Sequence, residues 1–243
     1  MERAVYQRLD RLEQQHWWFA ARRKIIETMI VHFCGRGSDK KVLEAGCGTG
    51  GNLQMLSGFG ELAAFELDDE ARTLASAKFK MEIKPGHLPD GIPFSPGQFD
   101  VVGAFDVLEH VEQDMESMSK LAEQLAPGGK LFITVPAMPW LWSKHDETHH
   151  HYRRYTRASL EAALKQAGLV PHYISYFNTF LFPVIAGFRL LRKALGLPET
   201  ADDEMPAPGV NKVLRLAFGA ERFLLGRISL PVGVSLFAVA GKP

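Results

Sequence analysis

Residues 42–50 constrain the fold of this chain more than any other part of its sequence. They read Val-Leu-Glu-Ala-Gly-Cys-Gly-Thr-Gly, an apolar run that leads into closely spaced glycines. Such a run predicts a strand, and the glycines predict a tight turn whose backbone N–H groups can approach a ligand. Gly46, Gly48 and Gly51 fit the pattern G-x-G-x-x-G, and Glu66 follows Gly46 by twenty positions at the end of the next apolar run. This arrangement predicts an α/β sheet that binds an adenosine cofactor.

Glu44 indicates which adenosine cofactor the loop binds. The glycine pattern alone fits a nicotinamide-binding Rossmann unit equally well. However, Glu44 stands two residues before the first glycine, where an anionic pyrophosphate should approach the N-terminus of a helix. A carboxylate suits a cationic ligand better, and S-adenosylmethionine has an ammonium and a sulfonium where NAD has phosphates. Glu44 therefore favours S-adenosylmethionine.

Length and composition limit the alternatives. A chain of 243 residues with 46% hydrophobic content is expected to form a single α/β domain over residues 1–243. Lys plus Arg equals Asp plus Glu at 28 each, so no nucleic-acid partner is expected. The first fifteen residues are densely charged and lack the apolar core of an ordinary signal peptide, and only Cys34 and Cys47 are present. We therefore expect a cytoplasmic protein.

Strands and helices alternate along the chain. The candidate strands are residues 42–44, 62–66, 99–105 and 130–135, and the candidate helices include 69–80 and 112–125, with Pro-Gly-Gly as a stop after the second. Such alternation predicts a parallel sheet covered by helices on both faces. Ligands then bind at the carboxyl ends of the strands, where Glu44, Glu66 and Asp106 fall.

The sequence resembles the class I S-adenosylmethionine-dependent methyltransferases. The resemblance rests on Glu-Ala-Gly-Cys-Gly-Thr-Gly at 44–50, Phe-Asp-Val-Val at 99–102 and Asp-Val-Leu-Glu-His at 106–110, and it covers about residues 40–168. It implies a Rossmann-like three-layer sandwich. Its seven-stranded, mostly parallel sheet would have the order 3-2-1-4-5-7-6 and an antiparallel last strand. Residues 170–176 and 233–241 are the candidates for the last two strands in the chain.

The resemblance also implies a set of cofactor contacts. Glu44 and the glycine loop would hold the methionine portion of S-adenosylmethionine or its product S-adenosylhomocysteine, and Glu66 would accept hydrogen bonds from both ribose hydroxyls. His87 stands where similar proteins often carry an aspartate for the adenine amino group, so adenine would be held mainly by packing. The full expected set is Arg23, Glu44, Ala45, Gly46, Cys47, Gly48, Asn52, Glu66, Leu67, His87, Leu88, Phe105, Asp106 and His110.

Residues 140–156 form a loop rich in aromatic, imidazole and cationic side chains on the expected acceptor face. One interpretation is structural, with Thr156 as the N-cap of a helix that Gly168 ends. In a second, His145 or His151 deprotonates a hydroxyl acceptor, with His110 as a further catalytic candidate that could equally line the pocket. A metal site is disfavoured, because consecutive histidines cannot all converge on one ion. Its chemically suitable ligands would be His145, Asp146, Glu147, His149 and His151.

Two flanking regions are expected to shape the acceptor site. Residues 1–35 should form a helical lid, on which Arg22 or Arg23 either binds the methionine carboxylate or is solvated. Residues 177–227 are a helical insertion between the last two strands, with an acidic, proline-rich connection at 202–209 and a final helix near 212–225. The uncharged run at 180–188 is too short to span a bilayer. Burial in the protein is favoured there over peripheral membrane contact through 177–195, because Pro183 and Gly187 interrupt any long amphipathic face.

The function that fits these features best is methyl transfer to a small or lipid-like acceptor, at oxygen rather than at carbon or nitrogen. No Asn-Pro-Pro-Tyr or Asp-Pro-Pro-Tyr sequence follows the strand at 99–105, which argues against amino methylation of nucleobases. An NAD-dependent oxidoreductase is the runner-up, weakened by Glu44 and by the lack of a Tyr-x-x-x-Lys pair. A non-catalytic cofactor-binding or membrane-associated protein is the third alternative.

Overall fold

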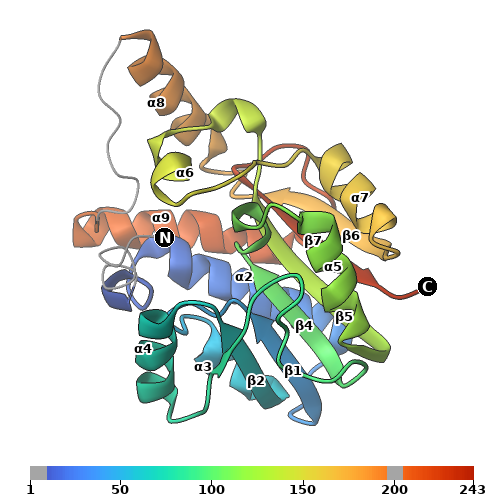
Figure 1. The fold of residues 1–243 in the computed structure, drawn as a ribbon. Helices are drawn as coiled ribbons and strands as arrows, with labels where there is room; N and C mark the ends of the chain where they lie inside the picture. The colour runs from blue at the N-terminus through green and yellow to red at the C-terminus, as the bar shows by residue number, and fades with distance from the viewer. Residues whose placement is uncertain (1–9, 196–204) are drawn as a thin grey trace.

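A seven-stranded sheet forms the centre of the protein in the computed structural model, which describes residues 10–195 and 205–243 (Figure 1). Its order is β3-β2-β1-β4-β5-β7-β6. The pairs from β3 to β5 are parallel, whereas β7 runs antiparallel to both of its neighbours. The predicted Rossmann-like architecture and strand order are confirmed. The strands are β1 (Lys40–Ala45), β2 (Gly60–Glu66), β3 (Lys84–Pro85), β4 (Phe99–Phe105), β5 (Leu125–Pro136), β6 (Val170–Phe177) and β7 (Ser235–Gly241).

Helices cover both faces of the sheet and complete a three-layer sandwich (Figure 1). They are α2 (Trp17–Cys34), α3 (Leu53–Leu56), α4 (Asp69–Phe79), α5 (Asp114–Glu123), α6 (Lys144–Thr148), α7 (Arg157–Gln166), α8 (Phe182–Ala194) and α9 (Pro208–Ala220), with 3-10 turns η1 (Ser57–Phe59), η2 (Leu108–His110), η3 (Pro139–Leu141) and η4 (Glu221–Phe223). On one face, α2 packs beside α9 and buries Ile26, Met29 and Phe218. On the other, α5 and α7 bury Leu121 and Leu160.

Side-chain caps begin the helices that follow β2 and the histidine-rich loop. Asp68 Oδ1 accepts a hydrogen bond from the backbone N–H of Glu70 at 2.9 Å, and Lys80 in a left-handed conformation (φ 52°) ends α4. Thr156 caps α7 as expected, because its hydroxyl accepts from the N–H of Ser159 at 3.0 Å. These local signals are sufficient to place both helices from the sequence.

The helix expected over residues 112–125 is shorter than predicted. α5 ends at Glu123, and Leu125 already belongs to β5, where it pairs with Phe99. The Pro-Gly-Gly sequence lies inside β5, and a Cβ on Gly129 would come within 2.6 Å of the Phe99 carbonyl oxygen. Gly129 therefore permits a close approach of two strands, and Gly128 adopts a positive φ of 79° rather than ending the helix.

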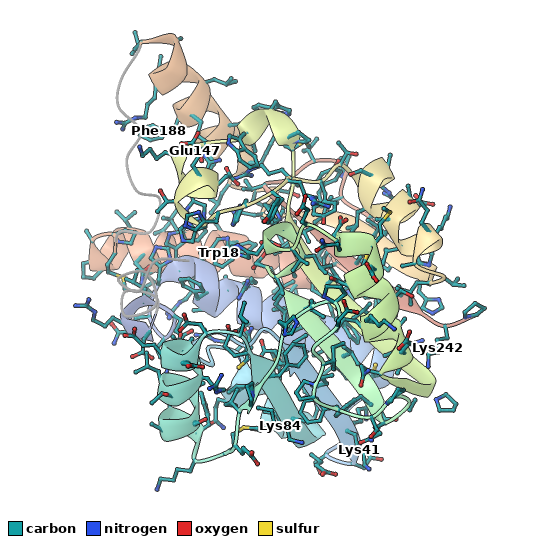
Figure 2. All side chains as sticks on the ribbon, in the orientation of Figure 1. Trp18, Lys41, Lys84, Glu147, Phe188 and Lys242 are labelled. Carbon is teal, nitrogen blue, oxygen red and sulfur yellow. The ribbon has the colours of Figure 1, made fainter. Side chains whose placement is uncertain are left out.

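The expectation that residues 180–188 are buried holds only in part, because Ala186 is buried but Val184 and Phe188 are exposed. α8 projects from the body of the protein, and Figure 2 shows Phe188 on this projecting part. Pro183 lies in the first turn of the helix, where a missing N–H costs no hydrogen bond, so it does not interrupt the apolar face. An apolar stripe with spacings of four, three and four residues is 51–70% exposed along α8. It consists of Val184, Phe188 and Leu191 on the helix and of Leu195 directly after its end.

α9 carries a second exposed apolar stripe. Val210, Val213 and Leu216 are 53–65% exposed, while the opposite side of the helix packs on α2. α9 begins at Pro208, earlier than the helix predicted near 212–225, and the predicted connection at 202–209 lies partly outside the described residues. Within the described part of the chain, no helix has the length and apolar character needed to cross a membrane.

Candidate functional site

Glu66 ends β2 and already holds the glycine loop in place. One of its carboxylate oxygens accepts a hydrogen bond from the N–H of Gly48 at 2.8 Å, and the other accepts from the N–H of Asp68 at 3.0 Å. Each oxygen keeps a further lone pair, so both can still accept from a ligand diol. The position is compatible with the expected ribose contact.

The loop after β1 needs its glycines for conformation and for space. Gly46, Gly48 and Gly50 all have positive φ values, of 65°, 55° and 88°. A Cβ on Gly46 would come within 3.0 Å of the Val107 side chain, so the loop packs closely against the turn that follows β4. The loop therefore brings its backbone to the carboxyl ends of β1 and β4, as the sequence predicted.

Glu44 is buried at the end of β1 with one oxygen unused. Asn52 Nδ2 donates to Oε1 at 2.7 Å, whereas Oε2 is buried and accepts no hydrogen bond from the described residues. Burial raises the pKa of Glu44 to about 8, against the opposing effects of Asn52 and Arg22. A buried unsatisfied oxygen beside a glycine loop fits a ligand that brings a cationic donor, such as an ammonium.

The described part of the N-terminal lid closes over this loop through Glu13, a residue that sequence reasoning missed. Glu13 is buried, and its Oε1 accepts hydrogen bonds from Thr49 Oγ1 and from Lys78 Nζ, each at 2.8 Å. Arg23 donates to the backbone carbonyls of Glu13 and Gln14. Its guanidinium therefore holds the lid segment, although it was expected to bind the methionine carboxylate.

Arg22 is the lid arginine that reaches the strand ends. It is buried, lies 4.5 Å from the Trp18 ring centroid and forms an ion pair with Asp106, directly after β4. Desolvation lowers the pKa of Arg22 to about 10, which still leaves it charged at neutral pH. Of the two arginines proposed from the sequence, Arg22 is therefore better placed to meet a ligand.

The expected adenine contacts lie beside β2 and β3. Leu67 is largely exposed next to Glu66, and Leu88 packs against the core. His87 is exposed, and its ring lies against Gly91, with which its backbone exchanges two hydrogen bonds. Leu67 thus offers an apolar surface, while the His87 imidazole contacts its own loop.

Asp146 organises the histidine-rich loop. It is fully buried, and its Oδ1 contacts His151 Nδ1 and accepts from Arg154 Nε, each at 2.8 Å, while the N–H of Ser143 donates to Oδ2 at 2.9 Å. Burial opposes ionisation, but the bonds from His151 and Arg154 prevail and hold the pKa of Asp146 well below its usual range. Asp146 is therefore an ionised carboxylate that orients His151.

The other candidate bases are half-buried imidazoles. Burial lowers the pKa of His145 and of His110 to about 3, so both rings are neutral at physiological pH. His145 packs against the ring of His149 at 4.0 Å, and His110 packs against His151 at 4.6 Å between ring centroids. Both rings can accept a hydrogen bond or donate one, but they are weak proton acceptors.

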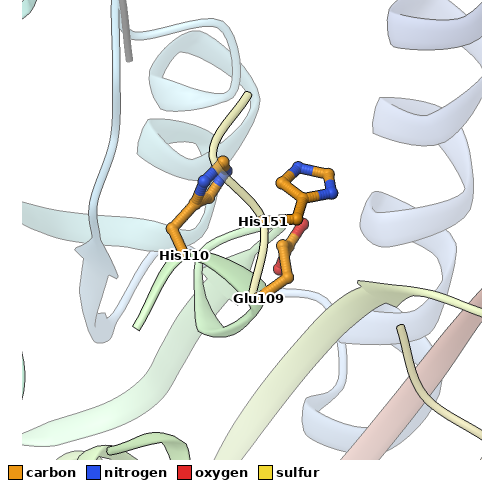
Figure 3. A group of neighbouring side chains, drawn as sticks. All are labelled: Glu109, His110 and His151. Carbon is orange, nitrogen blue, oxygen red and sulfur yellow. The ribbon is translucent and has the colours of Figure 1, made fainter. Parts of the chain in front are cut away.

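His110 and His151 meet Glu109, which sequence reasoning did not single out. Glu109 and His110 lie in η2, after β4, and His151 comes from the loop that follows α6 (Figure 3). One nitrogen or oxygen of each side chain lies within 4.8 Å of the others. Glu109 is buried, and burial raises its pKa to about 8. A cluster of potential proton acceptors therefore stands beside the ion pair of Arg22.

Comparison with known proteins identifies the family. The methyltransferase domain family matches residues 15–173 of this chain, which is well over half of its length. The chain belongs to this family. The predictions of a class I methyltransferase fold and of S-adenosylmethionine as the family's cofactor are confirmed.

Individual relatives agree with the family assignment. The chain is 26% identical over 162 residues to a "Probable S-adenosylmethionine-dependent methyltransferase" of Mycolicibacterium smegmatis, covering 65% of this chain and 61% of that protein. It is 27% identical to a ubiquinone biosynthesis O-methyltransferase of Xanthomonas euvesicatoria, covering 53% and 62%. The chain thus spans about six-tenths of the length of these two curated relatives. The solved structure of a SAM-dependent methyltransferase from Archaeoglobus fulgidus has the same fold, with a TM-score of 0.57, 15% identity and coverage of 90% and 94%.

Proposed function

We propose that this chain transfers a methyl group from S-adenosylmethionine to an oxygen atom of a small or lipid-like acceptor. The cofactor supplies a methyl group already activated on a sulfonium, so the protein has chiefly to hold the acceptor atom in line with it. A hydroxyl acceptor also needs a group that takes its proton. The observation that carries the proposal is that His151, from the loop after α6, meets Glu109 and His110 in η2, close to the carboxyl end of β4.

The residues at the other strand ends would hold the cofactor. Glu44 offers its unused Oε2 to the ammonium, and Glu66 offers both oxygens to the ribose diol. Arg22, held over Trp18 and paired with Asp106, would share its guanidinium with the carboxylate of the methionine portion. These contacts would direct the methyl group toward η2, since the glycine loop packs against Val107.

His151 is the best oriented group for the acceptor proton. Asp146 bonds to its Nδ1, which leaves Nε2 directed away from that carboxylate. His145 is the weaker candidate, because its ring packs against that of His149 and because its pKa, like that of His110, is lowered to about 3. The proposal therefore assigns the acceptor proton to His151 rather than to His145 or His110.

The exposed stripes of α8 and α9 support a lipid-like acceptor. Residues 178–195 and 205–220 contain no Asp or Glu, while Arg189, Arg192, Lys212 and Arg215 lie on the two helices. Apolar side chains flanked by cations suit an anionic bilayer surface. Similarity to a ubiquinone biosynthesis O-methyltransferase points in the same direction. We therefore propose peripheral membrane contact through these helices.

A methyl-acceptor screen tests this function. Protein and radiolabelled S-adenosylmethionine would be incubated with phenols and catechols, with and without a prenyl tail, and with matched amines and carboxylates. We expect transfer to hydroxyl groups, faster with the tail, and a loss of about 100-fold or more in His151→Ala. His172→Ala removes an exposed imidazole of β6 and should leave turnover unchanged. Transfer only to amines, or full activity of His151→Ala, would contradict the proposal.

A further inference from the structure

We propose that Glu109, His110 and His151 bind a divalent transition-metal ion such as Zn²⁺ (Figure 3). Within residues 10–195 and 205–243, these side chains form the one group of three or more His, Cys, Asp or Glu whose ligand atoms converge, all lying within 4.8 Å of one another. The larger ligand set considered from the sequence does not converge. Of its members, only His151 belongs to the cluster. Asp146 is instead engaged by Arg154.

The donor set matches the chemistry of such an ion. Two imidazoles and one carboxylate are the protein ligands of several catalytic zinc sites, which keep a fourth position open. Magnesium and calcium ions prefer oxygen ligands and are disfavoured here. Bonds of about 2.0–2.2 Å place the ligand atoms of a tetrahedral ion about 3.3 Å apart. Small side-chain rotations would therefore close the present cluster around an ion.

Glu109 supplies independent support, because its carboxylate is incompletely satisfied. The residue is 1% exposed, and its Oε2 is buried and accepts no hydrogen bond from the described residues. Figure 3 shows this carboxylate directed toward His151. An unpartnered buried carboxylate oxygen is costly unless a proton or a cation meets it. A metal ion held jointly with the two imidazoles would remove that cost.

The surrounding hydrogen bonds orient the imidazoles as metal sites require. Metal-binding histidines usually donate their second N–H to a carboxylate or carbonyl, which fixes the ring and its tautomer. His151 Nδ1 lies 2.8 Å from Asp146 Oδ1, so Nε2 is the nitrogen left for an ion. His110 is hydrogen-bonded to the backbone of His149. Both rings therefore already have the partners that a ligand set needs.

A catalytic role for this metal site depends on the proposed O-methylation. Metal binding by the three side chains does not depend on it. An ion at the cluster lowers the pKa of an acceptor hydroxyl that reaches its open position, and the proton leaves to water. The acceptor oxygen then forms a bond to the methyl carbon while the carbon–sulfur bond breaks, and that electron pair remains on sulfur. With the ion bound, His151 acts as a ligand and the proton leaves to water; without the ion, His151 keeps the proton-accepting role proposed above.

Direct binding measurements test the inference. Protein treated with a chelator and then freed of it would be titrated with Zn²⁺ by calorimetry, and with Co²⁺ by visible absorption, which reports the ligand geometry. We expect one tight metal site per chain. Its affinity should fall about 10- to 100-fold in Glu109→Gln and in His151→Ala. His172→Ala is the matched control and should bind normally. Far-UV circular dichroism and S-adenosylhomocysteine binding would show that each variant is folded.

The outcomes separate this inference from the proposed function. Absence of a tight site, or equal affinity in parent, Glu109→Gln and His151→Ala, would overturn the metal site. If hydroxyl methylation then continued in excess chelator, the proposed function would stand without a metal. Tight binding that the variants abolish, with no methylation of any hydroxyl, would support the metal site and refute the proposed function.

Discussion

Glu44 should make cofactor binding depend on pH in a predictable direction. Burial raises its pKa to about 8 in the unliganded protein, so the carboxyl group is largely protonated at pH 7. If the ligand ammonium pairs with the carboxylate, only the ionised form binds well, and binding releases a proton. We therefore expect the affinity for S-adenosylhomocysteine to rise with pH below 8.

The size of the effect follows from the ionised fraction. With a pKa of about 8, that fraction is about 1% at pH 6 and about 24% at pH 7.5, and the apparent dissociation constant varies inversely with it. The dissociation constant should therefore fall about 20-fold over this range. Between pH 6 and 7.5, the amino group of the ligand remains mostly charged and reduces the effect by less than about twofold.

Calorimetry at pH 6.0, 6.5, 7.0 and 7.5, repeated in buffers with different ionisation enthalpies, would measure both affinity and proton release. Glu44→Gln keeps the hydrogen-bonding shape without the titration and should show a nearly flat profile. 5′-Methylthioadenosine, which lacks the amino-acid portion, should be equally insensitive in the parent protein. A flat profile for the parent, or the same slope in Glu44→Gln, would refute the assignment of Glu44 to the ammonium.

Further predictions concern the ribose, the membrane and stability. Glu66→Ala should weaken the binding of S-adenosylhomocysteine at least tenfold, and an unchanged affinity in calorimetry would refute the ribose contact. Phe188→Ser should reduce sedimentation with anionic phospholipid vesicles about tenfold, since burying that side chain contributes about 1.5–3 kcal/mol. Val170→Ser, an exposed apolar position on β6, should sediment like the parent. Tyr155→Phe removes a buried 2.6 Å hydrogen bond to Asp114 and should lower the free energy of unfolding in urea by about 1.5–3 kcal/mol, whereas an unchanged midpoint would contradict this.

The sequence predicted best what short, contiguous stretches determine. The glycine loop and Glu44 belong to one run of chain, and Thr156 caps α7 through residues three positions away. The order of the sheet came from the resemblance rather than from periodicity. Such local signals require no knowledge of what packs against them, which is why they survived comparison with the structure.

The features that the sequence missed depend on distant packing. Glu109 belongs to the Asp-Val-Leu-Glu-His stretch but was not singled out as a site residue. Its importance comes from its burial and from its proximity to His151, which lies in a separate loop. The stripe of α8 was expected to be buried, since hydrophobicity alone does not show whether a partner covers it. Arg22 and Arg23 are adjacent, and only the turn of α2 decides that one reaches Asp106 while the other binds lid carbonyls.

The charges around the loop also bear on the choice of cofactor, beyond what Glu44 alone could show. Glu13 and Glu66 both act to raise the pKa of Glu44, so carboxylates crowd the ligand side of the glycine loop. Lys78 already pairs with Glu13, and Arg22 already pairs with Asp106, so both cations are engaged by carboxylates of the protein. A pyrophosphate would meet this surplus of negative charge at close range, where little water screens it. A cationic ligand would relieve the repulsion, and the electrostatics of the folded site therefore oppose NAD for the same physical reason that they favour S-adenosylmethionine.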